Sequence, residues 1–290
     1  MISLLAGCLC SEPPVEVPKL LAAGPVACVL SDGRAVCETV ERESAYPTES
    51  ALTATGLQSL SMSGNLLCGI DWAEAIQCWG FDQYGVLDVP QGEWAAVAAG
   101  NSHACAIDAT GSPTCWGASF DYALEVPEGT VLATVLAGDN RTCGLNRDGS
   151  GWTCWGADRA LLESRGVILG VPGADDRLVQ VDLYGVNLFV VLEDGTLGYW
   201  GYPGDSYGRD QVPTGDAFVR VDAGTNNACA TRTDGTVVCW GTNAWGQDDI
   251  PTGEWRDVAA GDTSVCARDD LGDVTCWGCG GSCPVTNPQL

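Results

Sequence analysis

The chain has 290 residues, with 13 basic side chains against 38 acidic ones and a formal net charge of −25. Such a polyanion excludes nucleic acid as an expected partner, because contacts to a phosphate backbone need clustered lysine and arginine. No run of 18 apolar residues occurs, so no membrane-spanning helix is expected.

The first 16 residues are expected to form a leader before a single domain over residues 17–290. Leu4-Leu5-Ala6-Gly7-Cys8 resembles a bacterial lipobox, which makes Cys8 a candidate for lipidation. Only seven residues precede Cys8, without a basic n-region or a full apolar core, so a truncated lipoprotein signal and a chance match both stay open. One lysine among the 13 basic residues, with abundant Ala, Gly and Val, fits a high-GC bacterial genome.

One sequence theme recurs seven times along the rest of the chain, as the segments "VAAGNSHACAIDATGSPTCWG" and "VDAGTNNACATRTDGTVVCWG" illustrate. Such a repeat indicates the fold class, because units with the same sequence pattern have the same structure. The units are about 40 residues long and leave no room for a second domain. Their marker glycines are Gly24, Gly64, Gly100, Gly138, Gly185, Gly224 and Gly261.

Each unit is expected to form antiparallel strands. After the marker glycine come a short alternating run such as Ala104–Ile107 or Ala228–Thr231, then a turn, then a run that ends in Trp-Gly. Asp-Gly is a strong hairpin signal and occurs in four of these turns. Small β-meanders that cannot bury their own faces predict an all-β, seven-bladed β-propeller. The alternative is a β-solenoid, although its coils have shorter periods. The four turns are Asp32-Gly33, Asp148-Gly149, Asp194-Gly195 and Asp234-Gly235.

The pattern A-G-x-x-x-x-C-A-x-x-x-D-G-x-x-x-C-W-G resembles the repeat of the regulator of chromosome condensation family, over about residues 18–288. That resemblance implies seven-bladed propellers. Family members include a guanine-nucleotide exchange factor and a secreted β-lactamase inhibitory protein, so the resemblance carries the fold better than the function. The chain departs from the pattern at Cys37-Glu38, where Cys-Trp-Gly is expected, and in a longer fourth unit around Leu161–Val171.

Sixteen cysteines indicate an oxidising compartment. Twelve form one pair in each of six units, and opposed positions of a hairpin have β-carbons about 4.5–5.5 Å apart, so six disulfides within blades are predicted. Zinc is disfavoured, because structural sites use Cys-x₂₋₄-Cys spacing. In the fifth unit Val190 and Tyr199 are expected at the two cysteine positions. The pairs are Cys28/Cys37, Cys68/Cys78, Cys105/Cys115, Cys143/Cys154, Cys229/Cys239 and Cys266/Cys276.

The remaining cysteines are Cys8, Cys10, Cys279 and Cys283, which lie near the two ends of the chain. A propeller must join its first and last blades, because open strand edges pair with other chains. We therefore expect a covalent clasp from Cys10 to Cys279 or Cys283. A local Cys279–Cys283 bridge is the alternative.

Catalytic groups are scarce, so the sequence predicts no enzyme, no cofactor and no metal site. His103 is the only histidine and is expected to stabilise a turn. No phosphate-binding loop, nucleophile elbow or calcium-loop pattern occurs. Paired acids such as Asp269-Asp270 are expected in solvated loops, with calcium binding as the alternative.

Two sets of aromatic residues recur. Tryptophans at one position per unit indicate packing between blades: Trp79, Trp116, Trp155, Trp200, Trp240 and Trp277. A second set lies in the segments after Trp-Gly. Equivalent loops of a propeller emerge on one face, so these aromatic rings are expected to gather around the central axis. Tyr and Trp are typical of binding hot spots, and neighbouring acids would favour cationic or polar ligands. The candidate binding residues are Tyr84, Tyr122, Tyr207, Trp245 and Asp248.

The sequence therefore predicts a non-enzymatic, extracytoplasmic binding module. It is expected to be a monomer that is secreted, periplasmic or lipid-anchored and binds a protein or a glycan. The alternative is a guanine-nucleotide exchange factor-like regulator of a small GTPase, which only the family resemblance implies. The cysteines oppose it, because such a partner is cytosolic. A hydrolase with an acidic pair in the channel lacks a recognisable nucleophile and base.

Overall fold

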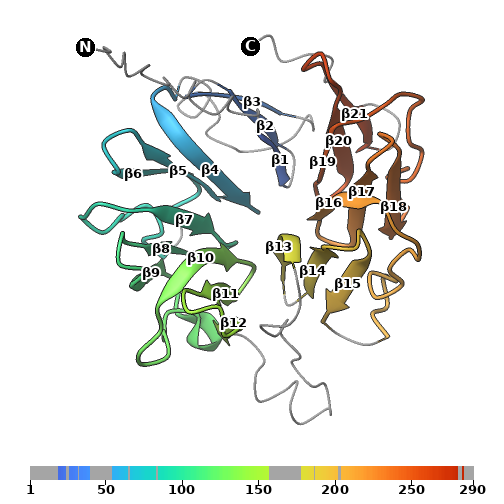
Figure 1. The fold of residues 1–290 in the computed structure, drawn as a ribbon. Coiled ribbons are helices and arrows are strands. Elements are labelled where there is room, and N and C mark those ends of the chain that lie inside the picture. The colour runs from blue at the N-terminus through green and yellow to red at the C-terminus, as the bar shows by residue number, and fades with distance from the viewer. Residues whose placement is uncertain are drawn as a thin grey trace, which may run out of the picture.

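The computed structural model describes residues 19–23, 26–31, 33–39, 54–64, 66–82, 84–156, 178–185, 187–201, 204–279 and 283. In these ranges the chain forms strands and one short 3-10 helix, η1 (Phe120–Tyr122). The strands make seven antiparallel sheets, each of three consecutive strands, arranged around a common centre (Figure 1). The predicted seven-bladed β-propeller is confirmed. None of the described residues belongs to a helix long and apolar enough to cross a membrane.

Each blade runs from an inner first strand to an outer third strand. The first strands are β1 (Lys19–Ala23), β4 (Leu57–Ser63), β7 (Ala96–Ala99), β10 (Leu132–Ala137), β13 (Leu178–Tyr184), β16 (Phe218–Ala223) and β19 (Asp257–Ala260). The middle strands are β2 (Val26–Ser31), β5 (Leu66–Asp71), β8 (His103–Ile107), β11 (Arg141–Asn146), β14 (Asn187–Leu192), β17 (Asn227–Arg232) and β20 (Ser264–Arg268). The third strands are β3 (Arg34–Thr39), β6 (Ile76–Gly80), β9 (Pro113–Gly117), β12 (Trp152–Gly156), β15 (Leu197–Trp200), β18 (Val237–Gly241) and β21 (Val274–Gly278).

The core lies between the blades. Every residue of β8 and β20 is buried, because each blade is covered on both faces by its neighbours. Seven apolar clusters are present among the described residues, and each combines side chains from two adjacent blades. One of them joins Val29 of the first blade to Ala259 and Val274 of the seventh, and β1 contacts β19. The ring is therefore closed by apolar packing at the seam of the first and last blades.

The cysteine pairs lie opposite each other in the second hairpin of six blades, with the register Cys105↔Cys115 as an example. The turns bring their α-carbons to 4.0–4.1 Å, and Gly149 and Gly235 adopt the positive φ that the Asp-Gly turns require. All six predicted disulfides are confirmed: Cys28–Cys37, Cys68–Cys78, Cys105–Cys115, Cys143–Cys154, Cys229–Cys239 and Cys266–Cys276.

The fifth blade differs from the sequence expectation by one residue. Phe189 lies opposite Tyr199, and Val190 lies opposite Gly198. The pair that closes the turn is Val191↔Leu197, which corresponds to Thr231↔Val237 in the sixth blade. Cys229 lies two residues before Thr231, so Phe189, two residues before Val191, occupies the cysteine position. The Phe189 and Tyr199 rings pack 5.1 Å apart, so an aromatic pair lies where the other six blades have a disulfide.

The expected clasp between the two ends of the chain is wrong for Cys279 and Cys283. These two cysteines are bonded to each other, with their α-carbons 5.4 Å apart. Only Gly280-Gly281-Ser282 separates them in the sequence, and the conformational freedom of glycine favours the closure of so short a loop. Cys8 and Cys10 lie outside the described residues.

Candidate binding surface on the glycine-turn face

The two kinds of turn lie at opposite ends of the blades. The first turn of a blade joins its first and second strands, and the second turn joins its second and third strands. The segment after each third strand begins beside the first turn, since the backbone N–H of Ala118 donates to the Ser102 carbonyl at 2.9 Å. The same segment ends beside the second turn, where the N–H of Leu132 donates to the Gly111 carbonyl at 2.8 Å. We name the first end, which carries the marker glycines, the glycine-turn face. The other end, with the Asp-Gly turns, is the aspartate-turn face.

The recurring tryptophans hold the loops of the glycine-turn face. In four of the six, the indole Nε1 donates to a backbone carbonyl in the loop that precedes the blade. All six lie in apolar clusters shared by two adjacent blades, which confirms the predicted packing between blades. In three of these loops the accepting residue lies two positions after the candidate binding residue, Tyr84, Tyr207 or Trp245. In the fourth loop it directly follows Tyr122. The links are Trp116 to Val86 at 2.8 Å, Trp155 to Ala123 at 3.0 Å, Trp240 to Arg209 at 3.0 Å and Trp277 to Gln247 at 2.7 Å.

The candidate aromatic side chains are all exposed. The exposed fractions are 52% for Tyr84, 68% for Tyr122, 48% for Tyr207 and 51% for Trp245, and Asp248 is exposed as well. Their loops follow the outer third strands, whereas the axial cavity is lined mainly by the inner first strands. None of these side chains lines that cavity, and their gathering around the axis stays a prediction.

Two of these residues lie close together and two lie apart. The Tyr84 ring meets the Phe120 ring edge-on, with centroids 4.9 Å apart, and Phe120 shares helix η1 with Tyr122. We name Tyr84, Phe120 and Tyr122 the aromatic patch. Phe120 was not among the binding residues expected from the sequence, although its place two residues before Tyr122 was a usable signal.

Tyr122 occupies a backbone position that favours glycine. Tyr122 directly precedes the residue whose carbonyl accepts the tryptophan hydrogen bond. In three other loops the residue at that position is a glycine, with φ between 70° and 83°: Gly85, Gly208 and Gly246. Tyr122 has a φ of 65° there, which costs an L-residue about 1–2 kcal/mol. Its side chain is exposed and gains little from packing, so the strain is not offset by burial.

Acidic side chains accompany the exposed aromatic residues. Asp82 and Asp88 lie in the loop of Tyr84 and Asp248 in the loop of Trp245; all three are exposed, and none of them forms an ion pair with a described lysine or arginine. The Asp82 carboxylate accepts one hydrogen bond from the Leu87 N–H at 3.3 Å. The surface therefore combines aromatic rings with negative charge.

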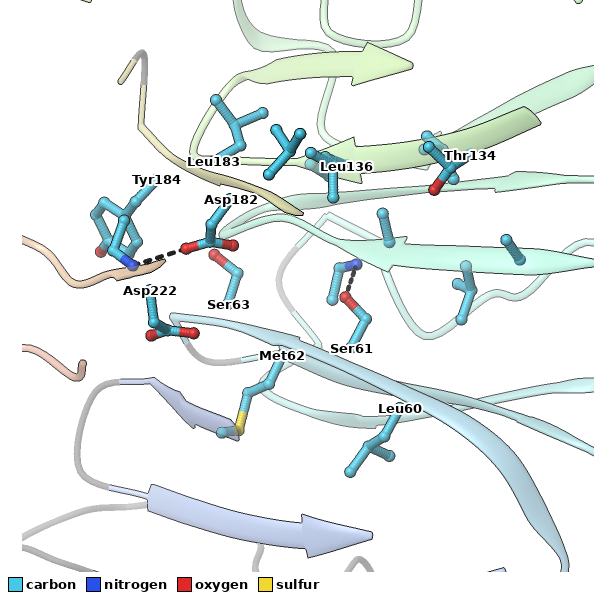
Figure 2. A pocket seen from close by; sticks show the side chains of 18 of the residues that line it. Leu60, Ser61, Met62, Ser63, Thr134, Leu136, Asp182, Leu183, Tyr184 and Asp222 are labelled. Atoms are coloured by element: carbon cyan, nitrogen blue, oxygen red, sulfur yellow. Dashed lines mark hydrogen bonds between the residues drawn. The ribbon is translucent and has the colours of Figure 1, made fainter. Parts of the chain in front are cut away.

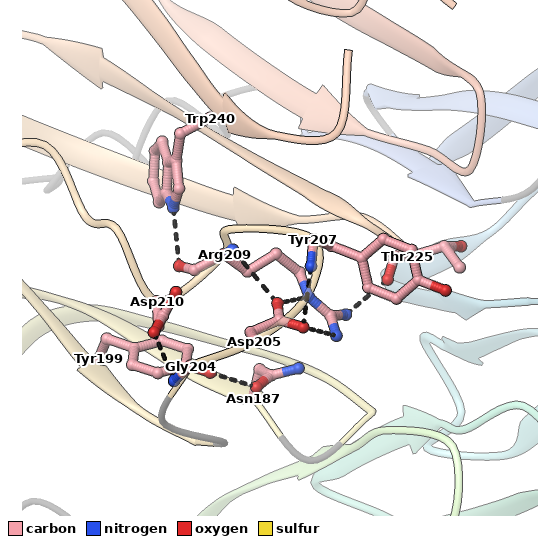
Figure 3. A network of polar contacts seen from close by, with 9 residues as sticks. All are labelled: Asn187, Tyr199, Gly204, Asp205, Tyr207, Arg209, Asp210, Thr225 and Trp240. Atoms are coloured by element: carbon pink, nitrogen blue, oxygen red, sulfur yellow. Dashed lines mark hydrogen bonds and ion pairs between the residues drawn. The ribbon is translucent and has the colours of Figure 1, made fainter. Parts of the chain in front are cut away.

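The loop with Tyr207 is held by an arginine network (Figure 3). The Arg209 guanidinium binds the Asp205 carboxylate at 2.6 Å and donates to the Thr225 carbonyl in the next blade at 2.5 Å. Burial opposes the charge of Asp205, but the hydrogen bond and charge of Arg209 hold the pKa of that carboxyl below its usual value. Tyr207 is thus carried on a loop that is fixed to two blades, and its ring lies 5.4 Å from the guanidinium carbon.

The axial cavity has a volume of about 300 Å³ and an acidic side (Figure 2). Asp182 accepts from the Ala223 N–H, and Asp222 accepts from the Ala260 N–H, both at 2.7 Å. Burial, followed by the charge of Asp182, raises the pKa of the Asp222 carboxyl well above its usual value. These carboxylates link the inner strands of neighbouring blades. No group of three or more metal-binding side chains occurs among the described residues.

His103 also serves the structure, but in a strand and not in a turn as expected. It lies fully buried in β8, and its Nε2 is 2.8 Å from the Thr142 hydroxyl of the next blade. Burial lowers its pKa to about 4, so the imidazole is neutral at pH 7.

Comparisons with known proteins agree with this architecture. Residues 218–247 match the family model described as the regulator of chromosome condensation (RCC1) repeat. No curated protein sequence matches the chain. Among solved structures, the CRINKLY WD40 ectodomain of the receptor kinase ACR4 from Arabidopsis thaliana has a TM-score of 0.69 and 24% identity, over 93% of this chain and 100% of that one.

Two further structures are similar. The entire ectodomain of the receptor kinase CR4 from Physcomitrella patens has a TM-score of 0.66 and 23% identity, over 90% of this chain and 72% of that one. Prp20p from Saccharomyces cerevisiae has a TM-score of 0.61 and 14% identity, over 86% and 75%. The protein is a seven-bladed β-propeller with a disulfide in six of its blades. More particularly, its sixth repeat is similar to the RCC1 repeat, which the family model matches over residues 218–247.

Proposed function

We propose that this protein is a non-enzymatic module that works outside the cytoplasm and binds another protein through the glycine-turn face. The observation that carries the proposal is Tyr122, which is 68% exposed and held at a backbone position suited to glycine. Side chains of this kind, beside Tyr84 and Phe120, supply the large and rigid contact area of binding hot spots. The anionic surroundings favour a partner segment with basic side chains.

The location outside the cytoplasm is supported by seven disulfides among the described residues, because such bonds persist in oxidising compartments. Two of the similar structures are ectodomains of receptor kinases. Secretion and attachment through a lipid on Cys8 both agree with this location. A glycan is the second candidate ligand, because exposed aromatic rings also stack on sugars.

The exchange-factor alternative has less support. Prp20p binds Gsp1p and histones, which is a property of Prp20p itself. At 14% identity the likeness of this chain to Prp20p concerns the fold. The disulfides of the present chain are the observation that opposes a cytosolic GTPase partner.

The test uses the oxidised full chain immobilised and exposed to extracellular fractions of its source, with each captured partner purified and its affinity measured by calorimetry. Tyr122→Gly and Tyr84→Ala are each expected to weaken binding by about 2 kcal/mol, as for a hot-spot anchor. Trp72→Ala is the matched control, since Trp72 is 63% exposed in a turn of the opposite face. If both patch variants bind as tightly as the wild type and Trp72→Ala does not, the glycine-turn face is not the site.

A further inference from the structure

The aspartate-turn face carries a groove in which arginines gather. The groove lies between the sixth and seventh blades, has a volume of about 620 Å³ and is lined by Arg220, Arg232 and Arg256. The whole chain has 13 basic residues against 38 acidic ones, so three guanidinium groups in one groove are a local exception. The volume is in the range of small-ligand sites.

Two of these arginines already have carboxylate partners. Arg220 is paired with the buried Asp257 at 3.0 Å, and Arg268 approaches the second oxygen of the same carboxylate at 3.8 Å. Two guanidinium groups thus approach one carboxylate, so Arg220 is engaged within the fold. Arg256 is paired with Asp270 at 2.9 Å, but the two side chains are 55% and 74% exposed. An exposed pair of this kind contributes little and exchanges readily with other partners.

Arg232 is different, because its guanidinium forms no hydrogen bond or ion pair with any described residue. The group is half-buried and lies over the Phe218 ring, with its central carbon 4.6 Å from the centroid. The nearby Asp234 spends one oxygen on its own turn, where it accepts from the backbone N–H and the hydroxyl of Thr236 at 2.9 and 2.7 Å. The contact with the Phe218 ring positions the Arg232 guanidinium and uses none of its N–H groups, which are left to donate elsewhere.

We propose that this groove binds a carboxylate group, held by two parallel hydrogen bonds from Arg232 with Arg256 as the second cation. A planar guanidinium edge matches a carboxylate in this way. The charge of the lining selects among anions: Arg220, Arg232 and Arg256 face Asp234, Glu254 and Asp270, so the groove has no net charge. A monoanion is accepted there, whereas a phosphate dianion meets the three carboxylates with a second negative charge.

The experiment follows the arginine Nε–H signals of the full, oxidised chain by NMR during titration with N-acetylglutamate amide. N-acetylglutamine amide is the neutral isostere. We expect a saturable shift of the Arg232 signal with the first compound and none with the second. Arg232→Lys keeps the charge but removes the fork, and we expect its affinity to fall by about tenfold or more. Arg147→Lys is the matched control on the same face, because the Arg147 guanidinium already donates to the Ala109 carbonyl at 2.9 Å.

Two further measurements identify the source of the carboxylate and test the contribution of the Phe218 ring. A tetraglutamate peptide that binds more tightly than propionate identifies an acidic protein segment as the source of the carboxylate, and equal affinities identify a small organic acid. Phe218→Leu removes the stacked ring while keeping Arg232, and weaker binding by this variant supports the proposal. The proposal fails if the glutamine compound shifts the Arg232 signal equally, if inorganic phosphate binds more tightly than the glutamate compound, or if no signal shift saturates.

Discussion

The indole Nε1 of Trp277 donates a 2.7 Å hydrogen bond to the carbonyl of Gln247, which lies 30 residues earlier in the loop of the preceding blade. Both residues are buried, Trp277 with 7% and Gln247 with 1% of its surface exposed. The bond fixes the loop that presents Trp245 on the surface. One tryptophan therefore serves both the packing between blades and the geometry of the candidate binding face.

Replacement of this tryptophan by phenylalanine is the first prediction. Trp277→Phe leaves the buried Gln247 carbonyl without its donor, which is expected to lower the free energy of unfolding by about 1–3 kcal/mol. Denaturation in guanidinium chloride under oxidising conditions measures it. Trp245→Ala, in the same loop but exposed, should stay within about 0.5 kcal/mol of the wild type. Equal losses in the two variants would contradict the role of the bond.

The register of the fifth blade gives the second prediction. Phe189 and Tyr199 occupy the positions of the cysteine pairs, so the double variant Phe189→Cys/Tyr199→Cys should form a seventh blade disulfide. The Val190→Cys/Tyr199→Cys variant should leave two free thiols, because its residues are one position out of register. Thiol counting after alkylation, with non-reducing peptide mapping, distinguishes the two. A disulfide in the second variant and none in the first would overturn the register.

Relief of backbone strain is the third prediction. Tyr122→Gly is expected to stabilise the fold by about 0.5–1 kcal/mol, because the left-handed conformation costs glycine nothing and the loss of chain entropy offsets only part of the gain. Thermal unfolding measures this change. The same variant should bind the partner less tightly. A variant that loses stability would show that the Tyr122 ring contributes to packing and would weaken its assignment to binding.

The fourth prediction concerns His103, the only histidine of the chain. Burial lowers its pKa from 6.5 to about 4, so the unfolded chain binds its proton more readily than the folded one. Stability from this residue is complete above pH 6.5 and is lost as the pH falls towards 4, by up to roughly 3 kcal/mol. The NMR titration of its ring protons gives the pKa directly. A midpoint near 6.5 would contradict the burial argument.

The blades and their disulfides were predictable because both depend on local sequence. The marker glycine, the Asp-Gly turn and a Cys-to-Cys separation of 9 to 11 residues all belong to one hairpin. The fifth blade shows the limit of that reasoning. Without a cysteine to mark the register, only the pair Val191↔Leu197 that closes the turn decides which residues are opposed.

The surfaces were harder to foresee because they depend on contacts between separate units. The repeat pattern does not reveal which side chains line the axial cavity, and none of the candidate aromatic residues does so. The meeting of Tyr84 with Phe120, 36 residues further on, depends on the spacing of adjacent blades. The availability of Arg232 follows from the pairing of Arg220 and Arg256 with other carboxylates, and no local signal in the sequence carries that information.

Every disulfide among the described residues closes within one blade or within the short segment after β21, and none joins one blade to another. Six of the seven units of about 40 residues therefore carry their own covalent support. When such a unit is duplicated or deleted in a gene, no cysteine in the other blades that the structure describes loses its disulfide partner. Propellers built this way can gain and lose blades over evolution at little risk of mispaired thiols, and ring size is left to the fit between neighbouring faces.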